Sequence, residues 1–75
     1  MMNTLDRDIL VARKLYKELD TLANQDLAQL SNQAGFRVAS MAEQILAERT
    51  VMNTEPTAGT RLRKEYIEHL NQIYG

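Results

Sequence analysis

The sequence contains no cysteine, one histidine, one proline and three glycines among its 75 residues. Without cysteine, the chain has no disulfide, no thiolate zinc site and no cysteine nucleophile. His69 alone supplies one of the roughly three protein ligands that a catalytic zinc needs. The glycines, at positions 35, 59 and 75, are too scattered to form a phosphate-binding loop. These absences predict no metal, no cofactor, no small-molecule substrate and no enzymatic activity.

Long hydrophobic runs are also missing from the sequence. No stretch approaches the roughly 18 apolar residues that a membrane-spanning helix needs, so we expect no membrane insertion. The N-terminal residues carry two acids, Asp6 and Asp8, and no basic segment leads into an apolar run there. This pattern differs from that of a signal peptide. Together with the lack of cysteine, it predicts a cytoplasmic protein.

Charge of one sign does not dominate the chain. Nine lysines and arginines face ten aspartates and glutamates, for a formal net charge of −1. This balance argues against nucleic-acid binding through bulk charge. The length predicts a single domain over residues 1–75. A domain of this size buries only about 60% of the surface of its unfolded chain, so its margin of stability is thin and a partner is plausible.

Apolar residues between positions 5 and 30 recur in alternating steps of four and three, which predicts an amphipathic helix over residues 5–33. Neither glycine nor proline interrupts it before Gly35. Asp26 and Gln29 nevertheless have the spacing of a capping box, so the helix either continues or breaks near residues 24–26. Gly35 is predicted to be a left-handed C-cap, with Phe36 folding back on the preceding turn.

Two further amphipathic helices are predicted, over residues 37–51 and 60–74. In the last one, Leu62, Tyr66, Leu70 and Ile73 form the apolar stripe. Ile67 and Tyr74 lie at its border. The sequence therefore predicts an all-α fold, a small bundle of three helices, or of four if the first one breaks.

Residues 27–46 resemble a helix-turn-helix, in which a glycine allows the tight turn and the second helix enters the major groove of DNA. Two positions depart from that pattern. Val38 lies where the motif usually faces solvent, and Gln44 lies where an apolar residue usually packs. The resemblance implies a DNA-binding transcriptional regulator. Its candidate DNA-contacting residues are Arg37, Ser40, Gln44, Arg61, Arg63 and Lys64.

The alternative hypothesis, which we favour, is a protein-protein interaction module that self-associates as a homo-oligomer. The apolar arc over residues 5–30 is broad for so small a domain. A continuous helix over 5–33 would be about 40 Å long, and the shorter helices would leave it uncovered. The small size and neutral charge suit an adaptor, inhibitor or assembly component of the kind that phages and other mobile elements encode. The candidate interface residues are Leu15, Tyr16, Leu19, Leu22, Tyr66 and Tyr74.

Overall fold

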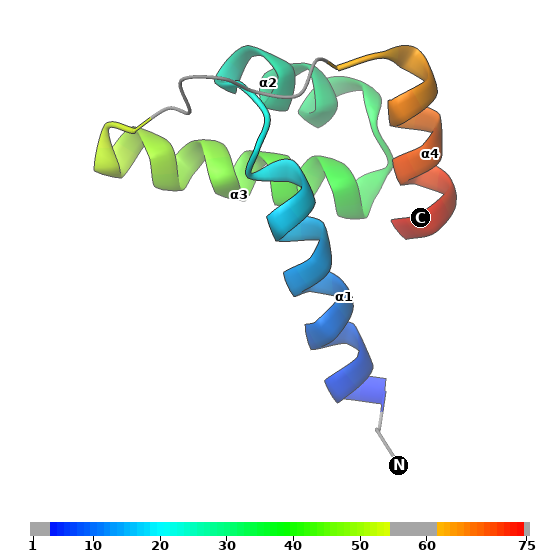
Figure 1. Ribbon diagram of the computed structural model, residues 1–75. Helices are drawn as coiled ribbons and strands as arrows, with labels where there is room; N and C mark the ends of the chain where they lie inside the picture. Colours follow the sequence, from blue (N-terminus) through cyan, green and yellow to red (C-terminus); the bar gives the residue numbers. More distant parts are fainter. Residues whose placement is uncertain (1–3, 55–61, 75) are drawn as a thin grey trace.

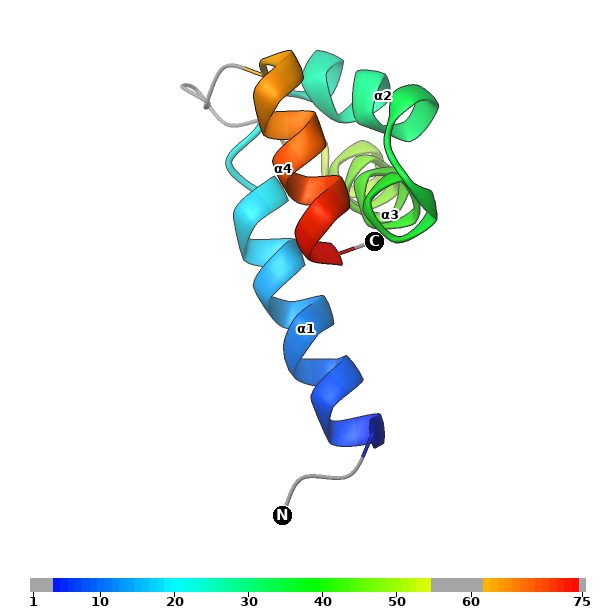
Figure 2. The same ribbon diagram turned by 90° about the vertical axis from the view of Figure 1, so that its right-hand side faces the viewer.

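A computed structural model describes residues 4–54 and 62–74. This part of the chain forms four α-helices and no strand. The helices are α1 (Thr4–Leu19), α2 (Asn24–Gln33), α3 (Phe36–Met52) and α4 (Lys64–Tyr74). Figures 1 and 2 show α2, α3 and α4 gathered around the C-terminal end of α1, whose N-terminal half points away from them. The fold is therefore the four-helix alternative of the predicted all-α bundle.

The first predicted helix breaks at residues 20–23, slightly before the expected position. Thr21 Oγ1 donates a hydrogen bond to the carbonyl oxygen of Glu18 at 3.1 Å, and the Leu22 amide donates to Leu19 at 3.0 Å. These local bonds turn the chain without glycine or proline. The predicted capping box of Asp26 is wrong, because the N-cap of α2 is the extended Ala23, three residues earlier, whose side chain makes no cap.

The turn between α2 and α3 differs from the predicted left-handed cap. Gly35 has φ −65° and ψ 168°, an extended conformation that does not require glycine, and it is the N-cap of α3. Its amide donates a hydrogen bond to Asn71 Oδ1 of α4 at 2.8 Å. Phe36 does not fold back on α2, since 83% of its surface is exposed. The turn is therefore set by a contact with α4, and the aromatic ring projects into solvent.

The last two helices follow their predicted bounds except at the start of α4, since α3 is longer than predicted by only one residue at each end. α3 ends at Met52, and its C-cap is Asn53, the only described non-glycine residue with a positive φ, 53°, a conformation that asparagine tolerates. α4 begins at Lys64, and the carbonyl oxygen of Arg63 accepts amide hydrogen bonds from Tyr66 and Ile67. The predicted helix start near residue 60 is therefore wrong for residues 62 and 63, which are not helical. Residues 60 and 61 lie outside the described part.

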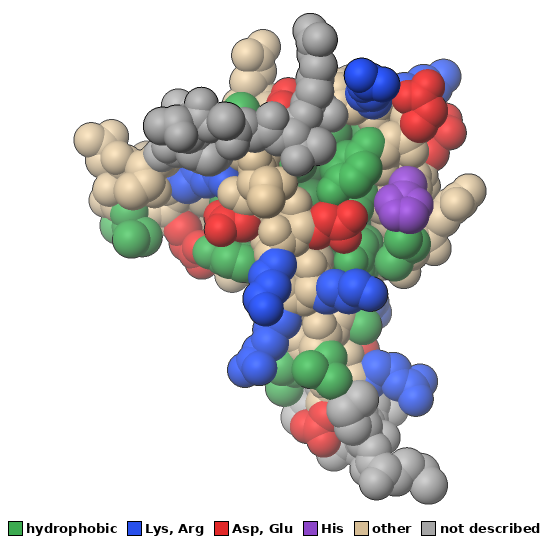
Figure 3. All heavy atoms as spheres, in the orientation of Figure 1, with side chains coloured by type: hydrophobic (Ala, Val, Ile, Leu, Met, Phe, Trp, Pro, Cys, Tyr) green, Lys and Arg blue, Asp and Glu red, His purple; other side chains and the backbone are tan. Residues whose placement is uncertain are grey.

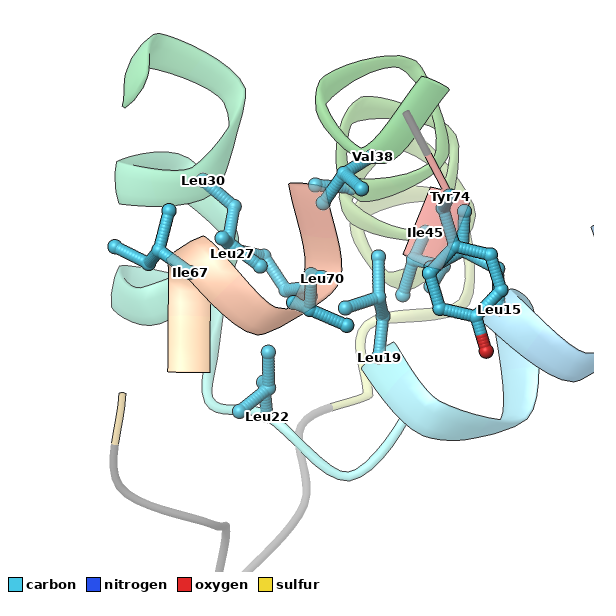
Figure 4. Packing of buried hydrophobic residues seen from close by; sticks show 11 residues of the cluster. Leu15, Leu19, Leu22, Leu27, Leu30, Val38, Ile45, Ile67, Leu70 and Tyr74 are labelled. Atoms are coloured by element: carbon cyan, nitrogen blue, oxygen red, sulfur yellow. The ribbon is translucent and has the colours of Figure 1, made fainter. Parts of the chain in front are cut away.

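One hydrophobic core joins all four helices (Figure 4). Leu19, Leu27 and Leu70 approach its centre from α1, α2 and α4, and none of the three has exposed surface. Complete burial of one such side chain contributes roughly 1.5–3 kcal/mol. The buried apolar residues are Leu15, Leu19, Leu22, Leu27, Leu30, Val38, Ala42, Ile45, Ile67, Leu70 and Tyr74.

The core also corrects the predicted face of α4. Ile67 and Tyr74, which the sequence placed at the border of the apolar stripe, are buried beside Leu70. Ile73, predicted to lie within the stripe, is 53% exposed. The inward face is thus rotated toward Ile67. Within the described residues, none of the helices has both the length and the apolar character that crossing a membrane requires.

Candidate functional site

A hollow of about 310 Å³ lies between the middle of α1 and the N-terminal half of α3. It exists because α1 packs on α3 through its C-terminal half and then diverges from it, as Figure 1 shows. We call this hollow and its rim the α1/α3 groove. Its apolar lining consists of Val11, Ala12, Leu15, Phe36, Met41 and Tyr74. Its polar lining consists of Asp8, Arg37, Ser40 and Gln44.

The apolar side chain of Phe36 projects at the α1/α3 groove. Phe36 lies on its lining and is 83% exposed, although burial of its ring would stabilise the protein by about 25 cal/mol for each square ångström removed from water. Ile9 and Leu10, which are 45% and 47% exposed on the free half of α1, are not among the residues that line the groove. An exposed ring beside an apolar hollow is typical of a surface that contacts another molecule.

The two charges of the α1/α3 groove belong to different helices. Asp8 lies on the α1 wall and Arg37 on the α3 wall, and both side chains are exposed. In the described part of the chain, neither takes part in an ion pair, unlike Arg49 and Asp20. The groove thus combines an apolar floor with one unpaired charge of each sign.

The opposite face of α1 is basic. Figure 3 shows lysine and arginine side chains along the length of this helix. The exposed cations of α1 are Arg7, Arg13, Lys14 and Lys17. Such a face remains solvated when a partner covers the other side of a helix. The apolar side of α1 is therefore the side that lines the α1/α3 groove.

Most of the predicted interface residues hold the chain's own helices together. Leu15, Leu19 and Leu22 are 3%, 0% and 0% exposed, so three of the predicted contacts have almost no surface to offer a partner. Tyr74 is 5% exposed. Leu15 and Tyr74 still line the α1/α3 groove, whereas the partly buried Tyr16 and Tyr66 do not.

The structure brings together half of the predicted DNA-contacting residues. Arg37, Ser40 and Gln44 are exposed on one side of α3, and all three line the groove. Arg63 and Lys64 are exposed at the start of α4, outside the groove, and Arg61 lies outside the described residues. Val38 is completely buried, although its position in the helix-turn-helix pattern usually faces solvent.

Glu18 links α1 to α4 through two tyrosines. The hydroxyl of Tyr66 donates to Glu18 Oε1 at 3.1 Å, and the hydroxyl of Tyr74 donates to Glu18 Oε2 at 2.8 Å. Burial, together with the Glu18 carboxylate, raises the pKa of each tyrosine to about 12. Both tyrosines are therefore neutral hydrogen-bond donors near pH 7. Their hydrogen bonds hold α4 against α1, and they do not act as bases.

Alkaline pH is expected to destabilise the fold through this cluster. Unfolded tyrosine titrates near pH 10, and the pKa of Tyr66 and Tyr74 is about 12 in the folded chain, so the unfolded state releases these protons first. The stabilisation that these two tyrosines provide is fully present below about pH 10 and is lost as the pH rises toward 12. Urea midpoints measured from pH 8 to 11 test this. The Y66F/Y74F double variant should show a clearly shallower fall, and an equal fall would contradict the assignment.

Arg49 is the one buried charged residue in the described chain, and the sequence analysis did not single it out. Its guanidinium donates to the carbonyl oxygens of Leu22 at 2.6 Å and Asp20 at 2.7 Å, and to Asn24 Oδ1 at 2.9 Å. These three acceptors span the break between α1 and α2. Arg49 therefore fixes that break from α3, and its role is structural.

His69, the one histidine of the sequence, lies outside the α1/α3 groove. The described residues contain no group of three or more histidine, aspartate or glutamate side chains placed to hold a metal ion. His69 is exposed, and its ring stacks on Tyr66 with the centroids 6.4 Å apart. His69 is not among the residues lining the groove, so Ser40 has no histidine beside it there to act as a base.

Comparisons with protein-family models, with curated proteins and with solved structures gave no match. The α1/α3 groove is therefore the feature that bears on function.

Proposed function

We propose that this protein is a small, non-enzymatic protein-protein interaction module. The observation that carries the proposal is the α1/α3 groove, with an apolar hollow of about 310 Å³ and the exposed ring of Phe36 on its lining. Interfaces are built around apolar and aromatic anchors with a polar rim, and Asp8, Arg37 and Gln44 provide such a rim. The chain would act as an adaptor, inhibitor or assembly component.

The groove is a better candidate than the other exposed apolar patch. Val51 and Met52 are 86% and 70% exposed at the end of α3. The hollow beside them is lined only by these two residues, Ala47 and Glu48, all from one helix. A surface built from one turn of one helix offers less shape to recognise than one walled by α1, α3 and α4.

DNA binding through α3 is a second candidate, favoured by the break between α1 and α2. The break makes α2 and α3 a separate helical hairpin with Arg37, Ser40 and Gln44 exposed together. Against it, Arg37 is the one exposed cation of α3, and Glu43 is exposed on the same helix. Phosphate contacts need several cations. Duplex binding at low salt that disappears in R37A would identify this activity.

Site-specific photo-crosslinking in the cells that encode the protein tests the interaction module. A photoreactive residue at Ser40, exposed in the groove, is compared with one at Gln72, exposed on α4 outside it. We expect crosslinked protein from position 40 and little from position 72, because the proposed contact surface is the groove and Gln72 does not line it. Equal or absent crosslinking at the two positions would overturn the proposal.

A further inference from the structure

We propose that the occupant of the α1/α3 groove is a second copy of this chain, related to the first by a two-fold axis. This inference rests on the proposed function and names the partner. In such an interface the same surface serves both subunits, so it must be complementary to itself in shape and in charge. Both requirements are met by residues that line the groove.

The shape of the α1/α3 groove is self-complementary. A projecting side chain, Phe36, and an apolar hollow of about 310 Å³ lie on the same surface. A two-fold axis through this surface brings the ring of each copy over the hollow of the other. A partner of another kind would have to supply a separate projection and would leave Phe36 to be covered elsewhere.

The charges are self-complementary as well. Asp8 and Arg37 lie on facing walls, and neither has an ion-pair partner in the described part of its own chain. In a two-fold interface, Asp8 of one copy meets Arg37 of the other, and the same contact forms a second time by symmetry. The net charge of −1 per chain adds little long-range repulsion between copies.

The free half of α1 also favours a second copy. Residues 6–10 are helical, yet each of them is exposed, and this half points away from the other helices (Figure 2). Short helices without tertiary packing are marginal in water. An interface over the groove covers the inner side of this segment in both subunits at once, while its basic outer face stays in solvent.

A charge-swap experiment tests the two-fold arrangement. Sedimentation equilibrium should show a dimer for the natural chain. Asp8→Arg places two cations on each groove and Arg37→Asp places two anions, so each variant alone should dissociate with a Kd raised at least about tenfold. An equimolar mixture of the two should form a heterodimer, detected by native mass spectrometry, because both cross-subunit pairs are then restored. Both residues are exposed, so circular dichroism should show intact folds.

A second pair of variants separates this surface from the rest of the molecule. Phe36→Asp should weaken the dimer at least about tenfold, whereas Val51→Asp, at a residue of similar exposure on the same helix, should leave it unchanged. A natural chain that is monomeric at high micromolar concentration would overturn the inference. So would a dimer that resists the charge swaps or a mixture that fails to associate.

The outcomes also separate the inference from the proposed function. A monomeric chain that still crosslinks to a different protein through position 40 keeps the interaction module and removes the second copy as its partner. A monomeric chain without crosslinks at that position removes both. Crosslinks at position 40 with a mass of two chains support both.

Discussion

Replacing Arg49 with methionine is expected to lower the free energy of unfolding by about 3 kcal/mol, because the buried Leu22 carbonyl loses its donor at a cost of roughly 1–3 kcal/mol and the two partly buried acceptors add smaller costs. Arg49 is 7% exposed and donates to Leu22, Asp20 and Asn24 at 2.6–2.9 Å. Methionine fills much of the same volume but donates nothing. The carbonyl oxygens in the break between α1 and α2 would lose their partner in a place that water reaches poorly.

The expected loss is large for this chain. A 75-residue domain has a total stability of roughly 4–11 kcal/mol, so the R49M variant should be partly unfolded at moderate temperature. Urea unfolding followed by circular dichroism measures the change. Arg49→Lys should lie between the two, since a lysine ammonium keeps the charge but cannot match the planar fork. Asp20→Asn is the control, because that carboxylate is 53% exposed and its pair with Arg49, at 3.5 Å, contributes little.

The consequence for dynamics distinguishes this role from general packing. If Arg49 fixes the break, amides at residues 20–23 should exchange with solvent sooner in R49M than those in the middle of α3. An R49M chain with wild-type stability would show that the break is stable without the guanidinium. In that case the local hydrogen bonds of Thr21 and Leu22 would be sufficient to end α1.

The position of Arg49 also explains how far the sequence could predict the fold. Local periodicity predicted the all-α class and placed α3 within one residue at each end. Periodicity could not decide whether α1 breaks, because residues 20–23 contain no glycine or proline. The guanidinium of Arg49, which binds the carbonyl oxygens of this break, lies more than 25 residues away in the sequence. The turn at Gly35 was wrong for the same reason, since its amide is held by Asn71 of α4.

The candidate site was predictable only in part. The sequence grouped Arg37, Ser40 and Gln44 on one helix face, and the structure keeps them together on the groove. The groove itself depends on the angle at which α1 leaves α3, which no local pattern encodes. The sequence also treated the apolar arc of residues 5–30 as spare surface. In the structure, the arc breaks at residues 20–23 and its leucines pack in the core between the helices. The groove therefore replaces the long helix as the reason to expect a partner.

The spacing of the tyrosines in α4 is a sequence signal for an acceptor such as Glu18, and it was not used above. Tyr66 and Tyr74 are eight residues apart, which places both hydroxyls on one side of a helix. A pair of half-buried hydroxyls needs acceptors, and a carboxylate on a facing helix can serve both. Choosing Glu18 among ten acidic residues, however, requires knowing which helix faces α4.

The Leu70→Ala variant is expected to lose about 3–5 kcal/mol of stability, the range typical of a leucine removed from a fully packed site. Leu70 has no exposed surface and lies between the leucines of α1 and α2 in Figure 4. The alanine variant leaves a cavity where three helices meet. Since α4 is held to the rest of the fold mainly by Ile67, Leu70, Tyr74 and the Glu18 hydrogen bonds, we expect this helix to detach first.

The matched control for this variant is Ile73→Ala on the same helix. The sequence placed Ile73 in the same apolar stripe as Leu70, whereas the structure leaves it 53% exposed. Its loss should change the free energy of unfolding by about 0.5 kcal/mol or less, the usual range for surface positions. Thermal and urea unfolding of the two variants therefore decide which face of α4 packs inward. A cost for I73A as large as that for L70A would return α4 to the predicted face and would take Tyr74 out of the wall of the α1/α3 groove.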